Sequence, residues 1–136
     1  MAKNSIAQGR DIDKLRLDIG RALTRCKRQE ARLTKAGVQN GHVHFKTDRP
    51  NTMFVLEPSV DGRRRYIHVG TDPKRQSLMV AAVERWGDRA RLQADMATLN
   101  DALDEFDRAV EYALRIGQRV RANALQTVEA HCGAAQ

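Results

Sequence analysis

Three consecutive arginines stand beside a tyrosine in the run Arg63-Arg64-Arg65-Tyr66, and two further cations, Lys74 and Arg75, follow within a short distance. Guanidinium groups bind phosphate oxygens, and a tyrosine ring stacks on an unpaired base. This combination predicts a surface that binds nucleic acid. The alternative interpretation is a charged hairpin tip that protects an exposed ribbon from pairing with another chain.

Histidines are the residues that best suggest a metal site. His42 and His44 are two residues apart on an expected strand and therefore point to the same side, and His68 lies on the expected return strand. No Asp, Glu or Cys stands at a spacing that completes a zinc site. Carboxylates such as Asp104 and Asp107 lie on a helix rich in both charges, where ion pairing is expected rather than acid-base catalysis. We therefore expect no metal, no cofactor and no enzymatic activity.

Positive charge is concentrated in the first part of the chain. The 136 residues carry a formal net charge of +7, with 17 Lys and Arg against 8 Asp and Glu over residues 1–75, and 7 against 9 over residues 76–136. Such a distribution predicts an anionic partner for the first part, most often nucleic acid. Three cations on the outer side of the first expected helix extend the basic surface: Lys27, Arg28 and Arg32.

Two long helices are expected to position these residues, over 12–36 and 73–128. Apolar residues recur in both at alternating steps of three and four, which is the spacing of a coiled-coil seam. Gly87 is followed by Asp88, a capping residue, so the second helix has a possible break there. The seams predict antiparallel, coiled-coil-like packing of the two helices, and a homodimer joined through the same seams is the open alternative. Their members are Ile12, Leu15, Ile19, Ala22, Cys26, Gln29 and Leu33, and then Leu92, Met96, Leu99, Leu103, Phe106, Val110, Ala113, Gly117, Val120 and Ala124.

The segment 42–69 changes to the alternating pattern of strands and predicts a two- or three-stranded antiparallel hairpin module. Asp61-Gly62 is a strong signal for a two-residue turn, because both positions tolerate positive φ. If the ladder continues regularly from that turn, Leu56 lies against Ile67 and Phe54 against Val69, all on one face.

These elements indicate an α+β fold in a single domain over residues 1–136, with flexible tails at 1–10 and 129–136. No stretch is apolar for long enough to span a membrane and the start is polar, so we expect a cytoplasmic protein without membrane contact. The two cysteines, Cys26 and Cys132, are expected as free thiols in that reducing compartment.

The order of features resembles a family of small uncharacterised proteins encoded beside transposases and on other mobile elements. The resemblance covers about residues 45–114 and rests on the hairpin Met53-Phe54-Val55-Leu56 and Gly62-Arg63-Arg64-Arg65-Tyr66-Ile67-His68-Val69, followed by a helix containing Trp86 and a long leucine-spaced helix. The cysteine cluster that often precedes the hairpin in that family is absent here. The resemblance implies a setting in phage, plasmid or transposon biology.

Two functions are consistent with these features. The first is a non-enzymatic accessory protein of a mobile element that binds nucleic acid or a nucleoprotein complex through the arginine-rich hairpin. The alternative is a protein-binding inhibitor of a host defence complex, of the anti-CRISPR type, which contacts a host protein subunit through its helix faces and hairpin edge.

Overall fold

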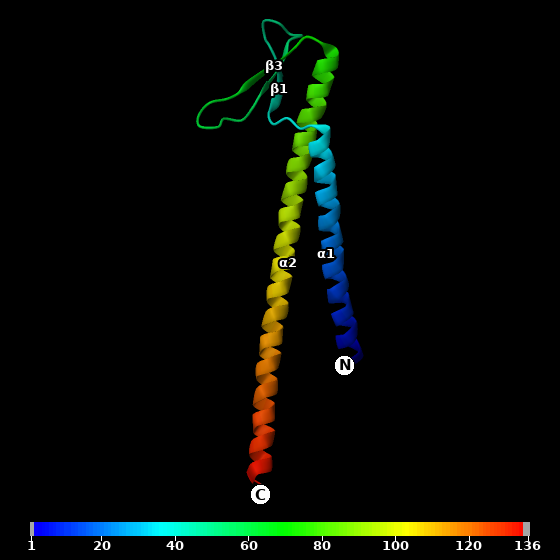
Figure 1. Ribbon diagram of the computed structural model, residues 1–136, viewed down its shortest axis with the longest axis vertical. Helices are drawn as coiled ribbons and strands as arrows, with labels where there is room; N and C mark the ends of the chain where they lie inside the picture. Colours follow the sequence, from blue (N-terminus) through cyan, green and yellow to red (C-terminus); the bar gives the residue numbers. More distant parts are fainter. Residues whose placement is uncertain (1, 135–136) are drawn as a thin grey trace. The chain divides into compact units, whose positions relative to one another are not determined.

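The computed structural model describes residues 2–134 and contains two helices and one three-stranded antiparallel sheet, so the predicted α+β class is confirmed (Figure 1). The elements are α1 (Ala2–Ala36), β1 (His42–Phe45), β2 (Met53–Leu56), β3 (Tyr66–Gly70) and α2 (Pro73–Ala134). Where the sequence predicts a single domain, the chain divides into two compact units. We call Gly20–Thr98 the sheet unit, and the described residues before and after it the helical unit.

Both helices are longer than the sequence predicts. α1 begins at Ala2 rather than near residue 12, and α2 continues without a break through Gly87 and ends at Ala134. The expected tails are therefore helical over 2–10 and 129–134, whereas Met1, Ala135 and Gln136 lie outside the described residues. The difference arises because a seam pattern marks where a helix packs, whereas its ends depend on local propensity. Gly87 does not break α2, because a single internal glycine destabilises a helix by only about 1 kcal/mol relative to alanine.

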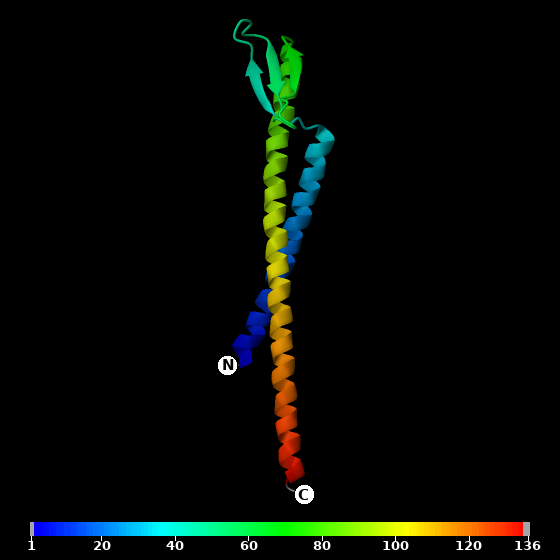
Figure 2. The ribbon, with the colours of Figure 1, turned by 90° about the vertical axis from the view of Figure 1, so that its left-hand side faces the viewer.

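The sheet has the strand order β1-β2-β3, and the first turns of α2 pack against one of its faces (Figure 2). Its core consists of Met53, Val55 and Val69, which are buried. Partly buried apolar residues of the neighbouring strands and of α2 surround this core: Val43, Ile67, Met79, Val80 and Val83. Because side chains alternate between the two faces of a strand, burial of one face against α2 leaves the intervening residues on the opposite, open face.

The predicted turn at Asp61-Gly62 is confirmed, but the register of the strands beyond it is not. Val60 pairs with Arg63 across the turn, and Asp61 and Gly62 have φ values of 55° and 76°. Within the strands, Leu56 pairs with Tyr66, Val55 with Ile67 and Phe54 with His68. The expected pairs, Leu56 with Ile67 and Phe54 with Val69, are therefore wrong by one residue.

Pro58 explains this shift. It has no backbone N–H to donate, so the ladder cannot continue regularly beside it. Between the turn and the ladder, the three residues 57–59 on one limb lie opposite the two residues 64–65 on the other. A one-residue shift exchanges the two faces of a strand. Val55 consequently faces α2, and Phe54 lies on the open face.

Polar contacts join α1 and α2 within each unit. In the sheet unit, the Glu30 carboxylate accepts a hydrogen bond from Gln93 at 2.9 Å and lies 3.5 Å from the Arg89 guanidinium. Arg89 also lies over the ring of Trp86, which is partly buried. In the helical unit, Arg16 forms an ion pair with Asp107 at 2.8 Å. No helix within residues 2–134 has a stretch long and apolar enough to cross a membrane.

Candidate nucleic-acid interface

Three aromatic rings, one from each strand, form a continuous stack on the open face of the sheet. The ring of Phe54 on β2 lies between His44 on β1 and Tyr66 on β3, with centroid separations of 5.3 Å to His44 and 4.8 Å to Tyr66. The interplanar angles are 22° and 21°, so the rings are nearly parallel. We call these three residues the aromatic ladder.

The two ends of the aromatic ladder are open to solvent. His44 is exposed, and Tyr66 is 47% exposed even though it stacks on Phe54. Because only one face of each terminal ring is turned toward Phe54, the other face points away from the stack. An unpaired base placed there would continue the stack, and such base-aromatic contacts are worth about 1–3 kcal/mol per base.

The sheet register positions these rings. His44 lies opposite Phe54 across β1 and β2, and His68 lies opposite Phe54 across β2 and β3. Tyr66 is two residues from His68 on the same strand and therefore occupies the same face. A diagonal contact of this kind is within reach of an aromatic side chain.

Cations border the aromatic ladder on two sides. The Lys46 ammonium lies 6.0 Å from the centre of the Tyr66 ring, and Lys46 lines a shallow hollow of about 310 Å³ with Phe54 and Tyr66. Arg64 lines a second hollow, of about 400 Å³, together with His42 and His44.

The three hairpin arginines remain available to an external anion. Arg63, Arg64 and Arg65 are exposed, and no hydrogen bond or ion pair involves their side chains among the residues that the structure describes. The backbone beside them is held, because Arg63 pairs with Val60 and the Arg65 carbonyl accepts a hydrogen bond from the Glu57 amide at 2.9 Å. Their guanidinium groups therefore extend from a fixed hairpin directly before Tyr66.

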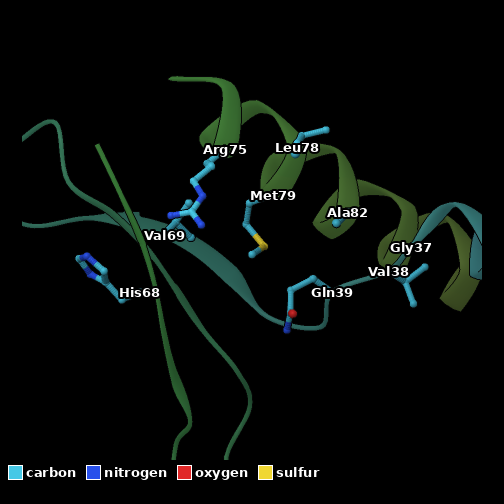
Figure 3. A pocket seen from close by; sticks show the side chains of 9 residues that line it. All are labelled: Gly37, Val38, Gln39, His68, Val69, Arg75, Leu78, Met79 and Ala82. Carbon is cyan, nitrogen blue, oxygen red and sulfur yellow. The ribbon is translucent and has the colours of Figure 1, made fainter. Parts of the chain in front are cut away.

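The other cations predicted from sequence lie on other elements. Arg75 extends from the first turns of α2 toward Val69 and lines a groove of about 420 Å³ with Leu78 and Met79 (Figure 3). Lys74 is exposed, and its backbone amide donates to the Asp72 carboxylate, which caps the start of α2. Lys27, Arg28 and Arg32 are exposed on α1, and no interaction recorded for the described residues links them to the aromatic ladder.

The three sheet histidines, His42, His44 and His68, do not form a metal centre among the described residues. His68 lines the groove beside α2 together with Arg75 and Met79 (Figure 3). His42 and His44 lie on one side of β1, and His68 lies opposite Phe54. Between Ala2 and Ala134, no three His, Cys, Asp or Glu side chains form a group that could hold a metal ion. His44 instead contributes its ring to the aromatic ladder.

Sequence reasoning found Tyr66 and the arginines of the hairpin, singled out His44 only as a candidate metal ligand, and missed Lys46 and Phe54. A regular ladder from Asp61-Gly62 places Phe54 on one face with Leu56, Ile67 and Val69 and so separates it from Tyr66. The signal that identifies it is Pro58, which interrupts the regular ladder between the turn and β2.

Comparison of the chain with protein-family models, with curated proteins and with solved structures finds no match.

Proposed function

We propose that this chain is a non-catalytic, cytoplasmic protein that binds single-stranded nucleic acid on the open face of its sheet. The observation that carries the proposal is the aromatic ladder of His44, Phe54 and Tyr66, which is open at both ends and bordered by Lys46 and the arginine hairpin. Stacking rings beside a basic surface are the combination by which proteins bind single strands without reading a defined sequence.

Each part of the site has a separate role in this proposal. Bases stack on the exposed rings of Tyr66 and His44, where they extend the existing stack. Arg63 and Arg65 bind phosphates beside a base stacked on Tyr66, and Arg64 binds a phosphate beside a base stacked on His44, because Arg64 lines the hollow of His42 and His44. Lys46 neutralises a further phosphate at the hollow that it lines with Phe54 and Tyr66.

The geometry favours unpaired over paired bases. A base inside a duplex is stacked on both sides, so its face is not free to join a ring of the protein. The hairpin arginines also bind duplex phosphates, but without the contribution of stacking. We therefore expect tighter binding to a single strand than to a duplex of the same length.

Antiparallel, coiled-coil-like packing of α1 and α2 belongs to the same proposal. Partly buried seam residues on both helices and the Glu30 contacts with Arg89 and Gln93 support it in the sheet unit. The setting we propose is a mobile element, which rests on the resemblance of residues 45–114.

Fluorescence anisotropy with a labelled oligonucleotide tests the proposal. The full chain is titrated into a single strand of mixed sequence and into the matching duplex, at several salt concentrations. We expect tighter binding to the single strand, and an affinity that falls by about 0.7 log units per log unit of salt for each phosphate neutralised. Equal affinity for the two forms, or no binding at low salt, would contradict the proposal.

A further inference from the structure

The second half of α2 carries an apolar face with no cover in the helical unit. Every residue from Asp107 to Gly133 is exposed, and Val110 and Val120 retain 40% and 61% of their accessible surface. The apolar residues follow one another at steps of three and four and so occupy one face of the helix. They are Val110, Ala113, Gly117, Val120 and Ala124, flanked by Leu114, Ile116 and Val128.

Such a face is costly in water. An apolar stripe on a helix is normally buried against another element, and most of the stability of a helix comes from that packing. Contiguous apolar surface that exceeds a few hundred Å² on a protein usually marks an interaction site. This part of α2 therefore needs a partner with a complementary apolar stripe.

Charge along the helix identifies the partner and its direction. Residues 101–111 contain the acids Asp101, Asp104, Glu105, Asp107 and Glu111 and a single base, Arg108. Residues 112–128 contain Arg115, Arg119 and Arg121 and no acid. A second copy in the antiparallel direction places each acidic segment beside the basic segment of the other, whereas a parallel copy places like charges together.

We propose that two copies of this chain pair antiparallel through residues 101–125 of α2, with the two-fold axis near Ala113. The small residues Ala113 and Gly117 then lie close to the axis. A Cβ atom at Gly117 would have no neighbour within 4 Å in the single chain, so there is room for a second helix. Val110 and Val120 lie on either side of the axis, in the apolar contact between the two copies.

The expected contact area is that of a weak dimer. An overlap of about 25 residues is about 37 Å long, and a strip about 12 Å wide on each helix amounts to roughly 900 Å² in total. This is close to the area of about 1,000 Å² at which specific interfaces begin. Ile12 and Leu15 of α1, both exposed in the same unit, add apolar surface beside it. We therefore expect a dissociation constant in the micromolar range.

Sedimentation equilibrium of the full chain tests the association. We expect a mass that rises toward twice that of one chain as the concentration increases through the micromolar range. The double substitution Val110→Asp with Val120→Asp should raise the dissociation constant at least about tenfold. The matched control, Thr127→Asp with Ala130→Asp, adds the same charge to α2 beyond the overlap of residues 101–125 and should change the dissociation constant by less than about twofold. A native chain that stays monomeric to about 200 μM would overturn the proposal.

A spin-label distance tests the direction without altering the apolar stripe. The variant carries Gln126→Cys, with Cys26→Ala and Cys132→Ser so that a single label is attached. Antiparallel pairing about Ala113 separates the two labels by about 40 Å along the axis, whereas parallel pairing holds them within about 20 Å. A dimer with the short distance would refute the antiparallel arrangement. Helical circular dichroism of each variant confirms that a lost association is not a lost helix.

Discussion

The rings of Phe54 and Tyr66 stack with their centroids 4.8 Å apart on the open face of the sheet. These residues belong to different strands and are not directly paired, because Phe54 lies opposite His68. The contact exists because the register is shifted by one residue relative to a regular hairpin. The same shift buries Val55 completely under α2. One irregularity in the hairpin therefore produces both the core and the candidate binding face.

Removal of the exposed end of the aromatic ladder should weaken binding of a single strand. Tyr66→Ala deletes a ring that contributes about 1–3 kcal/mol of stacking per base, so we expect a loss of about 5- to 150-fold in affinity. Tyr66→Phe keeps the ring and should bind nearly as the native protein does. Tyr112→Ala removes a ring on α2 that is 62% exposed, against 47% for Tyr66, and serves as the control. Anisotropy titrations with one labelled oligonucleotide compare the four proteins, and equal affinities for Tyr66→Ala and Tyr112→Ala would contradict the stacking role.

Removal of the hairpin charges should change the salt dependence. Replacement of Arg63, Arg64 and Arg65 by Gln removes three phosphate contacts, and the slope of log affinity against log salt should become shallower by about 2 units. The matched control replaces Lys27, Arg28 and Arg32 on α1 by Gln and removes the same formal charge. We expect its slope to change by less than about 0.5 units. If the two triple variants behave alike, only net charge matters and the hairpin has no special role.

Val55 should be the most sensitive core position of the sheet unit. Its side chain is 0% exposed and packs within the cluster that joins the sheet to α2. Val55→Ala deletes two methyl groups from this core and should lower the free energy of unfolding by about 2 kcal/mol. Val60→Ala, at a position that is 73% exposed, should change it by less than about 0.5 kcal/mol. Urea unfolding followed by circular dichroism provides both values, and equal effects would show that Val55 is not in the core.

Gly41 precedes β1 in a conformation that only glycine adopts easily. Its φ is 120°, and a Cβ atom there would lie 2.6 Å from the Leu56 carbonyl oxygen. Gly41→Ala should therefore destabilise the protein by about 2–4 kcal/mol, through backbone strain and displacement of β2.

The control for Gly41 is Gly20→Ala, since Gly20 lies within α1 and an added methyl group meets nothing within 4 Å. This change should stabilise the helix by up to about 1 kcal/mol. Urea unfolding again measures both variants. An unchanged stability in Gly41→Ala would mean that β1 does not approach β2 as closely as the structure shows.

Much of the fold follows from local patterns in the sequence. The alternating steps of three and four residues predict both helices, and Asp61-Gly62 predicts the turn that the structure contains. The predicted start of α1 is wrong, because the seam pattern indicates only where a helix packs against another element. Residues 2–10 form a helix without such a pattern. Gly87 lies within a continuous helix because its cost of about 1 kcal/mol is small beside the packing on either side.

The candidate site was harder to predict than the fold. Charge and the proximity of Tyr66 identify the arginine hairpin, because those features depend only on residue type and order. His44 and Phe54 depend on which face of a strand they occupy, and a shift of one residue reverses that assignment. Arg75 is close to the hairpin in sequence, but it lies in the groove beside α2 because its position is fixed by the helix rather than by the strand.

Photo-crosslinking is the most direct test of the proposal that single-stranded nucleic acid binds on the open face of the sheet. A single-stranded oligonucleotide with bromouracil at every third position is bound to the full chain and irradiated, and the crosslinked peptides are identified by mass spectrometry. The account predicts crosslinks on the peptides that contain Tyr66 and His44, and their loss when excess unlabelled single strand is added. Crosslinks that fall mainly on α1 or α2, with none on the three strands, would contradict it.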